Sequence, residues 1–198
     1  MILSRRRNMM IDSINNENED WDLEWNYTMG DPLENGFKLP AGVTNNYSSE
    51  ITEDGLYFDY ITPGSLYQIV PENYMTCNEG IYEIEVKIIR NNASNGQGLR
   101  LQLTNGTEGV GIYMITNNII QYNNGGQNIN IDIGSYNLNE WFKFRIELSN
   151  NTAYVYLNNN LIHQTTTLSK GYMTSGNRFL VQGNVECYVR SIKLKKIS

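Results

Sequence analysis

Apolar side chains recur at every second position in short runs throughout residues 21–198, and turns rich in Asn and Gly separate these runs. A period of two places apolar residues on one face of a β-strand and polar residues on the other. GIYEIEVKIIR (80–90), WFKFRIEL (141–148) and TAYVYL (152–157) all follow this pattern. No window shows helical periodicity. The sequence therefore predicts an all-β fold, an antiparallel two-sheet jelly-roll sandwich.

The first 20 residues lack this alternation and end in the polar run NNENED. Because 198 residues suit one domain, we interpret residues 21–198 as a single sandwich and residues 1–20 as an extended N-terminal docking arm. Its apolar and arginine side chains could lie in a groove on a partner and pair with carboxylates there. They are Ile2, Leu3, Arg5, Arg6, Arg7, Met9 and Met10. The alternative is a frayed terminus.

Charge and composition exclude several classes of partner. The formal net charge is −6, and an acidic body disfavours nucleic acid, because phosphate binding needs a basic surface. No segment approaches the ~20 apolar residues of a membrane span. The N-terminus also lacks the apolar run, roughly 7–15 residues long, of a signal peptide. With only Cys77 and Cys187 present, we expect free thiols rather than a disulfide framework.

The segment EDWDLEWNY (19–27) places Asp20, Asp22 and Glu24 on one face of a predicted strand. Closely spaced acids on a strand can build a glycosidase site, and residues two apart lie roughly 6.5–7 Å from each other. Alternation with polar groups outward is also the ordinary pattern of an antiparallel strand. We favour a solvated face on an outer strand.

The block NEWFKFRIELSNNTAYVYLNNNLIHQT (139–165) resembles the closing hairpins of the concanavalin A-like lectin/glucanase superfamily, especially its laminin-G-like members. GIYEIEVKIIRNN (80–92) is similar to the strand that precedes the active-site strand in the glucanase branch. There the catalytic carboxylates lie on the following strand as Glu-x-Asp-x-x-Glu or Glu-x-Asp-x-Glu. Here that strand is LRLQLTNG (99–106), which contains no carboxylate. The resemblance implies the sandwich fold, which hosts lectins, hydrolases and adaptors alike, and the missing carboxylates favour a protein that is not an enzyme.

Metal and cofactor sites find little support. His163 is the single histidine, so sites with several histidines are excluded. Laminin-G-like relatives bind calcium through Asp and backbone oxygens, and Asp54, Asp59 and Asp132 are the candidates here, but no spacing singles them out. We expect no metal and no cofactor.

Sugar sites combine an aromatic platform with neighbouring amides and carboxylates, because a pyranose has an apolar face and a rim of hydroxyls. Two groups supply these residue types. The first comprises Tyr113, Asn117, Asn118, Tyr122, Asn123 and Asn124, and the second Trp141, Tyr154 and Tyr156. The alternative is structural, since Tyr forms strands readily and cross-strand Tyr pairs stabilise sheets.

A lectin-like sandwich usually works outside cells, yet the chain shows no export signal. A virus particle would reconcile these two observations, because its proteins are made in the host cytoplasm and are released by lysis. MILSRRRNMM also resembles the short arginine-bearing N-termini of gut-phage virion proteins. Our first hypothesis is a non-enzymatic structural protein of a bacteriophage virion, a capsid decoration or a tail or fibre appendage made in the host cytoplasm. Its arm would bind other virion proteins, it would form a homo-oligomer in the particle, and host-surface glycans are a candidate ligand. The alternatives are a soluble carbohydrate-binding module and, behind it, a glycoside hydrolase.

Overall fold

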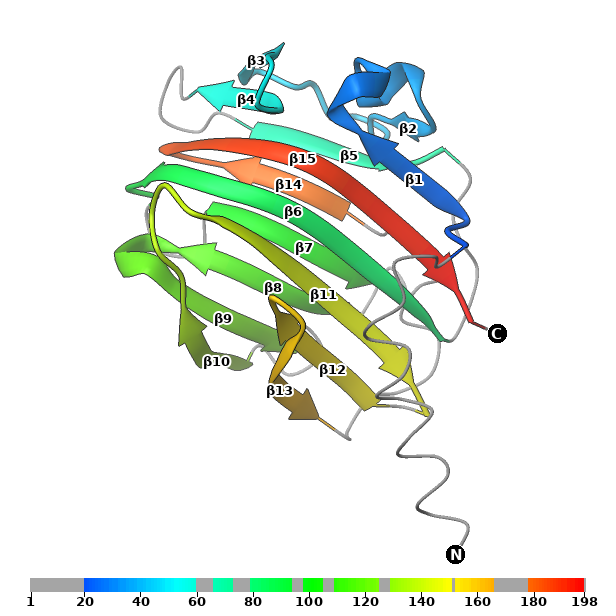
Figure 1. Ribbon diagram of the computed structural model, residues 1–198, viewed down its shortest axis with the longest axis vertical. Coiled ribbons are helices and arrows are strands. Elements are labelled where there is room, and N and C mark those ends of the chain that lie inside the picture. Colours follow the sequence, from blue (N-terminus) through cyan, green and yellow to red (C-terminus); the bar gives the residue numbers. More distant parts are fainter. Residues whose placement is uncertain are drawn as a thin grey trace, which may run out of the picture.

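Two antiparallel sheets lie face to face in a computed structural model of the chain (Figure 1). The structure describes residues 20–59, 66–72, 79–93, 98–104, 109–124, 129–150, 152–165 and 178–197. This arrangement confirms the predicted all-β, two-sheet sandwich of the jelly-roll type. None of the helices in these residues is long and apolar enough to cross a membrane.

The eight-stranded sheet has the order β13-β12-β11-β6-β15-β4-β3, and β1 also pairs with β15. Its strands are β13 (Asn160–Thr165), β12 (Thr152–Leu157), β11 (Trp141–Ser149), β6 (Gly80–Asn91), β15 (Val185–Lys196), β4 (Leu56–Asp59), β3 (Ser48–Ile51) and β1 (Leu23–Asn26).

The seven-stranded sheet has the order β10-β9-β8-β7-β14-β5-β2. Its strands are β10 (Ile129–Ser135), β9 (Ile119–Asn124), β8 (Gly109–Ile115), β7 (Gly98–Thr104), β14 (Arg178–Gln182), β5 (Leu66–Pro71) and β2 (Phe37–Lys38). Three short 3-10 helices, η1 (Tyr27–Met29), η2 (Pro32–Glu34) and η3 (Thr116–Asn118), lie in connections.

The core fills the space between the sheets, and the period-two pattern explains which side chains enter it. Ile84 and Val86 from β6 and Phe144 from β11 are fully buried on one side, and Leu101 from β7 and Ile112 from β8 are fully buried on the other. Fully burying one such side chain contributes about 1.5–3 kcal/mol.

An aromatic cluster also joins the two sheets. The centroid of the Phe58 ring on β4 lies 4.6 Å from that of the Tyr67 ring on β5 and 6.1 Å from that of the Phe179 ring on β14.

The acidic segment at the start of the domain forms an edge strand. Trp25 on β1 is fully buried, and its Nε1 donates to the Gly30 carbonyl at 2.9 Å. On the opposite face the Glu24 carboxylate pairs with Lys193 Nζ at 2.7 Å. The Asp22 carboxylate accepts from the backbone N–H of Lys196 at 2.6 Å. These two acids therefore hold β1 to β15.

Cys187 lies on β15 with its side chain fully buried in the core. Burial disfavours the charged thiolate and raises the pKa of this thiol well above its usual range. Cys187 is therefore a small core residue and a poor nucleophile. The other cysteine, Cys77, lies outside the described residues.

Candidate functional site

The outward face of the seven-stranded sheet carries a block of polar and aromatic side chains over β14, β7, β8, β9 and β10. Register defines it in two rows, because residues opposite each other on neighbouring strands point to the same side. One row reads Leu180, Arg100, Tyr113, Gln121 and Asp132, and the other reads Arg178, Gln102, Gly111 and Asn123. We call these nine residues the outer face.

Tyr113 is the aromatic centre of the outer face, and its ring lies along the sheet. Gly111, two residues earlier on β8, leaves the space for this ring, because a Cβ there would lie 2.6 Å from Tyr113 Cε1. The hydroxyl accepts a hydrogen bond from Gln102 Nε2 at 2.7 Å and donates to Asn123 Oδ1 at 3.3 Å. Neighbouring strands β7 and β9 thus hold the ring in one orientation.

Arg100 places positive charge over this ring, and Arg178 lies on β14 opposite Gln102. The guanidinium carbon of Arg100 lies 4.8 Å from the centroid of the Tyr113 ring. Both arginines are partly buried, and the Nε of each is buried with no hydrogen-bond partner among the described residues. Burial lowers the pKa of Arg100 from its ordinary value, because it disfavours the charged form.

Of the first group of predicted sugar-binding residues, only Tyr113 and Asn123 project from the outer face. Tyr122 was wrongly assigned to a binding surface, because it is 1% exposed and points into the core opposite Ile112. Asn117 and Asn118 lie in η3 with positive φ angles of 61° and 59°. The Asn118 carbonyl accepts from Tyr136 N at 3.0 Å, so these two residues shape the β8–β9 connection. The side chain of Asn124 is not among those described.

The second group lies on the other sheet and cannot share a ligand with Tyr113. The Trp141 ring stacks on Arg190, whose guanidinium carbon is 3.8 Å from the ring centroid, and Lys87 Nζ lies 5.1 Å from it. Tyr156 is only 6% exposed, which makes it unsuitable as an open platform, and burial raises its pKa to about 12. Tyr154 is half-buried on β12.

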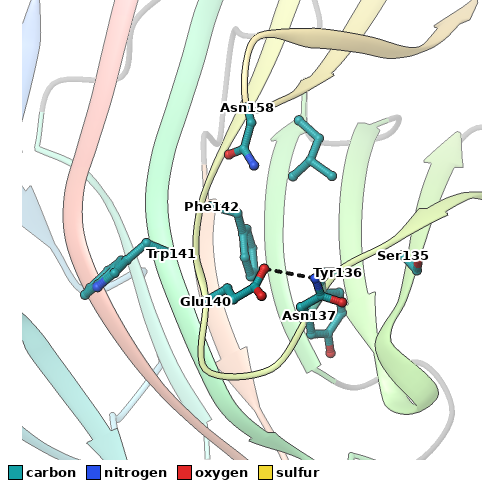
Figure 2. Close-up of a pocket in the computed structure, with 8 residues that line it drawn as sticks. Ser135, Tyr136, Asn137, Glu140, Trp141, Phe142 and Asn158 are labelled. Carbon is teal, nitrogen blue, oxygen red and sulfur yellow. Dashed lines mark hydrogen bonds between the residues drawn. The ribbon is translucent and has the colours of Figure 1, made fainter.

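A pocket of about 200 Å³ opens beside β11, where the β10–β11 connection meets the β12–β13 turn. Figure 2 shows Phe142 and Trp141 pointing to opposite sides of the strand. Asn137 Nδ2 donates to the Glu140 carboxylate at 2.9 Å (Figure 2), and Lys143 N donates to Asn158 Oδ1 at 2.9 Å. Glu140 gives this pocket a negative wall, which makes it chemically distinct from the outer face.

The remaining candidates are dispersed. Asp54 lies 3.9 Å from Lys87, Asp59 lies 3.6 Å from Arg90, and Asp132 accepts from Gln121 Nε2 at 2.8 Å. Within the described part of the chain, no three His, Cys, Asp or Glu side chains gather as metal ligands would. The His163 ring packs against Tyr122 at 4.5 Å between centroids, and burial lowers its pKa. Arm residues 1–19 lie outside the described residues.

The segment that we compared with the glucanase active-site strand on the basis of sequence resemblance forms β7, which lies between β8 and β14. Its outward residues Arg100 and Gln102 occupy the outer face, where neither can serve as an acid or a carboxylate nucleophile. The sequence singled out this strand only because LRLQLTNG contains no carboxylate, and it did not identify Arg100 or Gln102 as site residues. Arg178 and Gln121 were not predicted as site residues, because consecutive apolar residues in RFLVQ and NNIIQYNN leave the outward face of both strands undecided by the pattern alone.

The chain matches no family model and no curated protein sequence. Its structure is similar to carbohydrate-binding module CBM66 from Bacillus subtilis, with 14% identity, a TM-score of 0.55, and coverage of 81% of this chain and 96% of that one. Domain 4 of AbnA, a GH43 extracellular arabinanase from Geobacillus stearothermophilus in complex with arabinotriose, gives 9% identity, a TM-score of 0.63, and coverage of 89% and 92%.

An enzyme is also similar: the Crh5 transglycosylase gives 12% identity, a TM-score of 0.67, and coverage of 88% of this chain and 84% of that one. At identities this low the likeness concerns the fold. The chain therefore has the β-sandwich fold found in carbohydrate-binding modules, lectins and glycosidase domains, consistent with a concanavalin A-like sandwich.

Proposed function

We propose that this protein is a non-catalytic carbohydrate-binding module whose glycan lies across the outer face. The observation that carries this proposal is the Tyr113 ring, seated over Gly111 and held by Gln102 and Asn123. The fold shared with CBM66 and with the arabinose-oligomer-bound domain of AbnA supports the same class of ligand.

Chemistry on the outer face suits a sugar. A tyrosine ring offers an apolar surface to the C–H groups of a pyranose, and side-chain amides and guanidiniums bind its hydroxyl rim. Gln102, Gln121 and Asn123 supply the amides within one or two strands of Tyr113. Because the side chains stand on paired strands, the surface is largely formed before a ligand arrives, which reduces the entropy cost of binding.

The charges of the outer face support the proposal that the module is not catalytic. Retaining hydrolysis needs two carboxyl groups about 5–5.5 Å apart, and an inverting site needs two about 6.5–9.5 Å apart. Among the nine outer-face residues, Asp132 is the single carboxylate, and it accepts a hydrogen bond from Gln121. Asp22 and Glu24 form their contacts with β15, on the other sheet.

Glycan-array screening followed by calorimetry tests this function. Tyr113→Ala should abolish measurable binding of any glycan found on the array, and Tyr113→Phe, which keeps the ring and loses its hydroxyl bonds, should weaken it by about three- to tenfold. Tyr154→Ala is the matched control, since it removes a half-buried tyrosine from the other sheet. No bound glycan, or equal loss in both alanine variants, would contradict the proposal.

The virion role stays a prediction. It rests on Arg5, Arg6, Arg7 and their apolar neighbours in the arm, and on the resemblance of MILSRRRNMM to phage virion proteins. A displayed glycan-binding sandwich would serve such a particle by attaching it to host-surface sugars, so the two roles are compatible. Incorporation of the protein into particles, with and without the arm, is the deciding experiment.

A further inference from the structure

Arg100 and Arg178 are neighbours on the outer face. Arg178 on β14 lies opposite Gln102 on β7, and Arg100 is two residues from Gln102 on the same strand. The two arginines are therefore diagonal partners of an antiparallel pair, with a spacing of roughly 7–8 Å between their positions. Two guanidiniums rooted this close can both reach one anionic group placed above Gln102.

These two arginines differ from the other arginines of the described chain. Arg90 pairs with Asp59 and Glu186, Arg145 pairs with Glu83 and Glu147, and Arg190 pairs with Glu85. Neither Arg100 nor Arg178 forms an ion pair with any carboxylate of the described residues. This contrast is notable in a chain with 21 acidic and 15 basic side chains, in which carboxylates are the commoner charge.

A guanidinium that is partly buried and unpaired carries an unfavourable desolvation free energy. A bound carboxylate or sulfate offsets that cost, because the planar guanidinium donates two parallel hydrogen bonds to such groups. Arg100 lies directly opposite Tyr113, and Gln102, between Arg178 and Gly111, donates to the Tyr113 hydroxyl. An anion held by both arginines would therefore position its sugar ring at the tyrosine.

We propose that the outer face selects an acidic glycan, whose carboxylate or sulfate group lies between Arg100 and Arg178 while a sugar ring contacts Tyr113. This inference rests on the proposed function and adds the chemical class of the ligand. With a net charge of −6, the molecule as a whole repels polyanions. An anionic ligand would therefore need a locally basic surface, such as this arginine pair.

Calorimetry with a matched pair of probes tests the inference: an oligogalacturonate and the same oligosaccharide with its carboxyl groups methyl-esterified. A sulfated galactan oligosaccharide and its desulfated form make a second pair, which distinguishes sulfate from carboxylate. We expect the unmodified acidic member of at least one pair to bind about tenfold more tightly than its neutral form, since hydrogen bonds to charged groups are the stronger ones. Raising salt from about 50 to about 500 mM should weaken that preference.

Charge-removing variants complete the test. Arg100→Gln and Arg178→Gln should each reduce the preference for the acidic over the neutral probe about tenfold, because only the acidic probe carries the anion, whatever either guanidinium contributes to binding of the sugar hydroxyls. Arg190→Gln, which removes one positive charge from the other sheet, should leave this preference unchanged. Thermal unfolding of each variant verifies that it is folded.

The outcomes separate the two proposals. Equal binding of acidic and neutral probes, unaffected by Arg100→Gln and Arg178→Gln, would overturn the acidic-glycan inference and leave glycan binding intact. Loss of acidic binding in Arg190→Gln to the same degree would overturn it as well, because the effect would then reflect total charge. Absence of binding to both members of both pairs and to every glycan on the array would overturn the proposed function itself.

Discussion

Gly111 and Tyr113 are coupled through space on the same face of β8: the glycine lacks the one atom that would collide with the tyrosine ring. A Cβ at residue 111 would lie 2.6 Å from Tyr113 Cε1 and 3.3 Å from the Leu101 carbonyl oxygen. The strand therefore accepts a flat-lying ring only because residue 111 is glycine. The orientation of the proposed sugar platform thus depends on a residue without a side chain.

Gly111→Ala should displace the Tyr113 ring and break its hydrogen bond with Gln102. We expect glycan affinity to fall about tenfold, as on loss of a well-placed hydrogen bond together with ring contact, with little change in thermal stability. Gly134→Ala on β10 is the matched control, since its Cβ would meet Ile120 Cδ1 at an ordinary 3.7 Å. A crystal structure of Gly111→Ala with the ring unmoved and affinity retained would contradict the coupling.

Arginine removal should have opposite effects on stability at two positions. Arg100→Met keeps the aliphatic contact with the sheet and removes an unpaired, partly buried charge, so we expect the melting temperature to rise. Arg145→Met removes the partner of Glu83, at 3.8 Å, and of Glu147, at 3.7 Å. The buried Glu83 and Glu147 carboxylates each lose an ion pair, which should cost about 3 kcal/mol, while Lys143 Nζ stays 3.4 Å from Glu83. Calorimetric melting of both variants gives the comparison, and a lower melting temperature for Arg100→Met would contradict it.

Stability should depend on pH through His163. Burial lowers the pKa of this imidazole in the folded state, so as pH falls below about 6.5 the unfolded chain takes up a proton before the folded one does. Stability is therefore complete above that pH and declines as pH falls toward the folded-state pKa. His163→Gln should flatten this part of the curve, measured by urea unfolding between about pH 5 and pH 8. Parallel curves for the two proteins would show that His163 contributes nothing.

Deletion of residues 1–20 should separate display from recognition. If the arm docks on a virion partner, the truncated protein should be missing from purified particles and should still bind glycans on the array. The measurement is the ratio of this protein to the major capsid protein in purified particles, for the full chain and the truncation. Unchanged incorporation of the truncated protein would remove the virion hypothesis as formulated.

The sequence predicted the fold because alternation is explicit in the longest strands. In GIYEIEVKIIR and WFKFRIEL every second residue is apolar, so the inward face of β6 and of β11 can be read directly. Alternation also places Tyr113 outward, because Val110, Ile112 and Met114 occupy the inward positions of β8.

Tyr122 shows where the same rule fails. In NNIIQYNN two adjacent isoleucines make either face of the strand acceptable to the pattern. Only pairing of Tyr122 with Ile112 across β9 and β8 decides that its ring enters the core. Local periodicity carries no information about that register.

The sequence did not reveal which site residues are neighbours, because this depends on the pairing of strands that are far apart in the chain. Trp141 is outward as expected, yet its contact with Arg190 depends on a residue far away in the chain. Likewise, Arg178 joins Arg100 only because β14 inserts between β7 and β5. Without a register for β14, the sequence could not identify two neighbouring arginines.

The hydrogen bonds from Lys196 N to the Asp22 carboxylate and from Asp22 N to the Leu194 carbonyl, at 2.6 and 3.0 Å, place the first and last strands of the sandwich side by side. A short Gly/Ser linker could therefore join residue 20 to residue 197 and close the domain into a ring. New termini opened in an exposed turn such as Asn158–Asn159 would yield a circular permutant, with both ends beside β12 and β13.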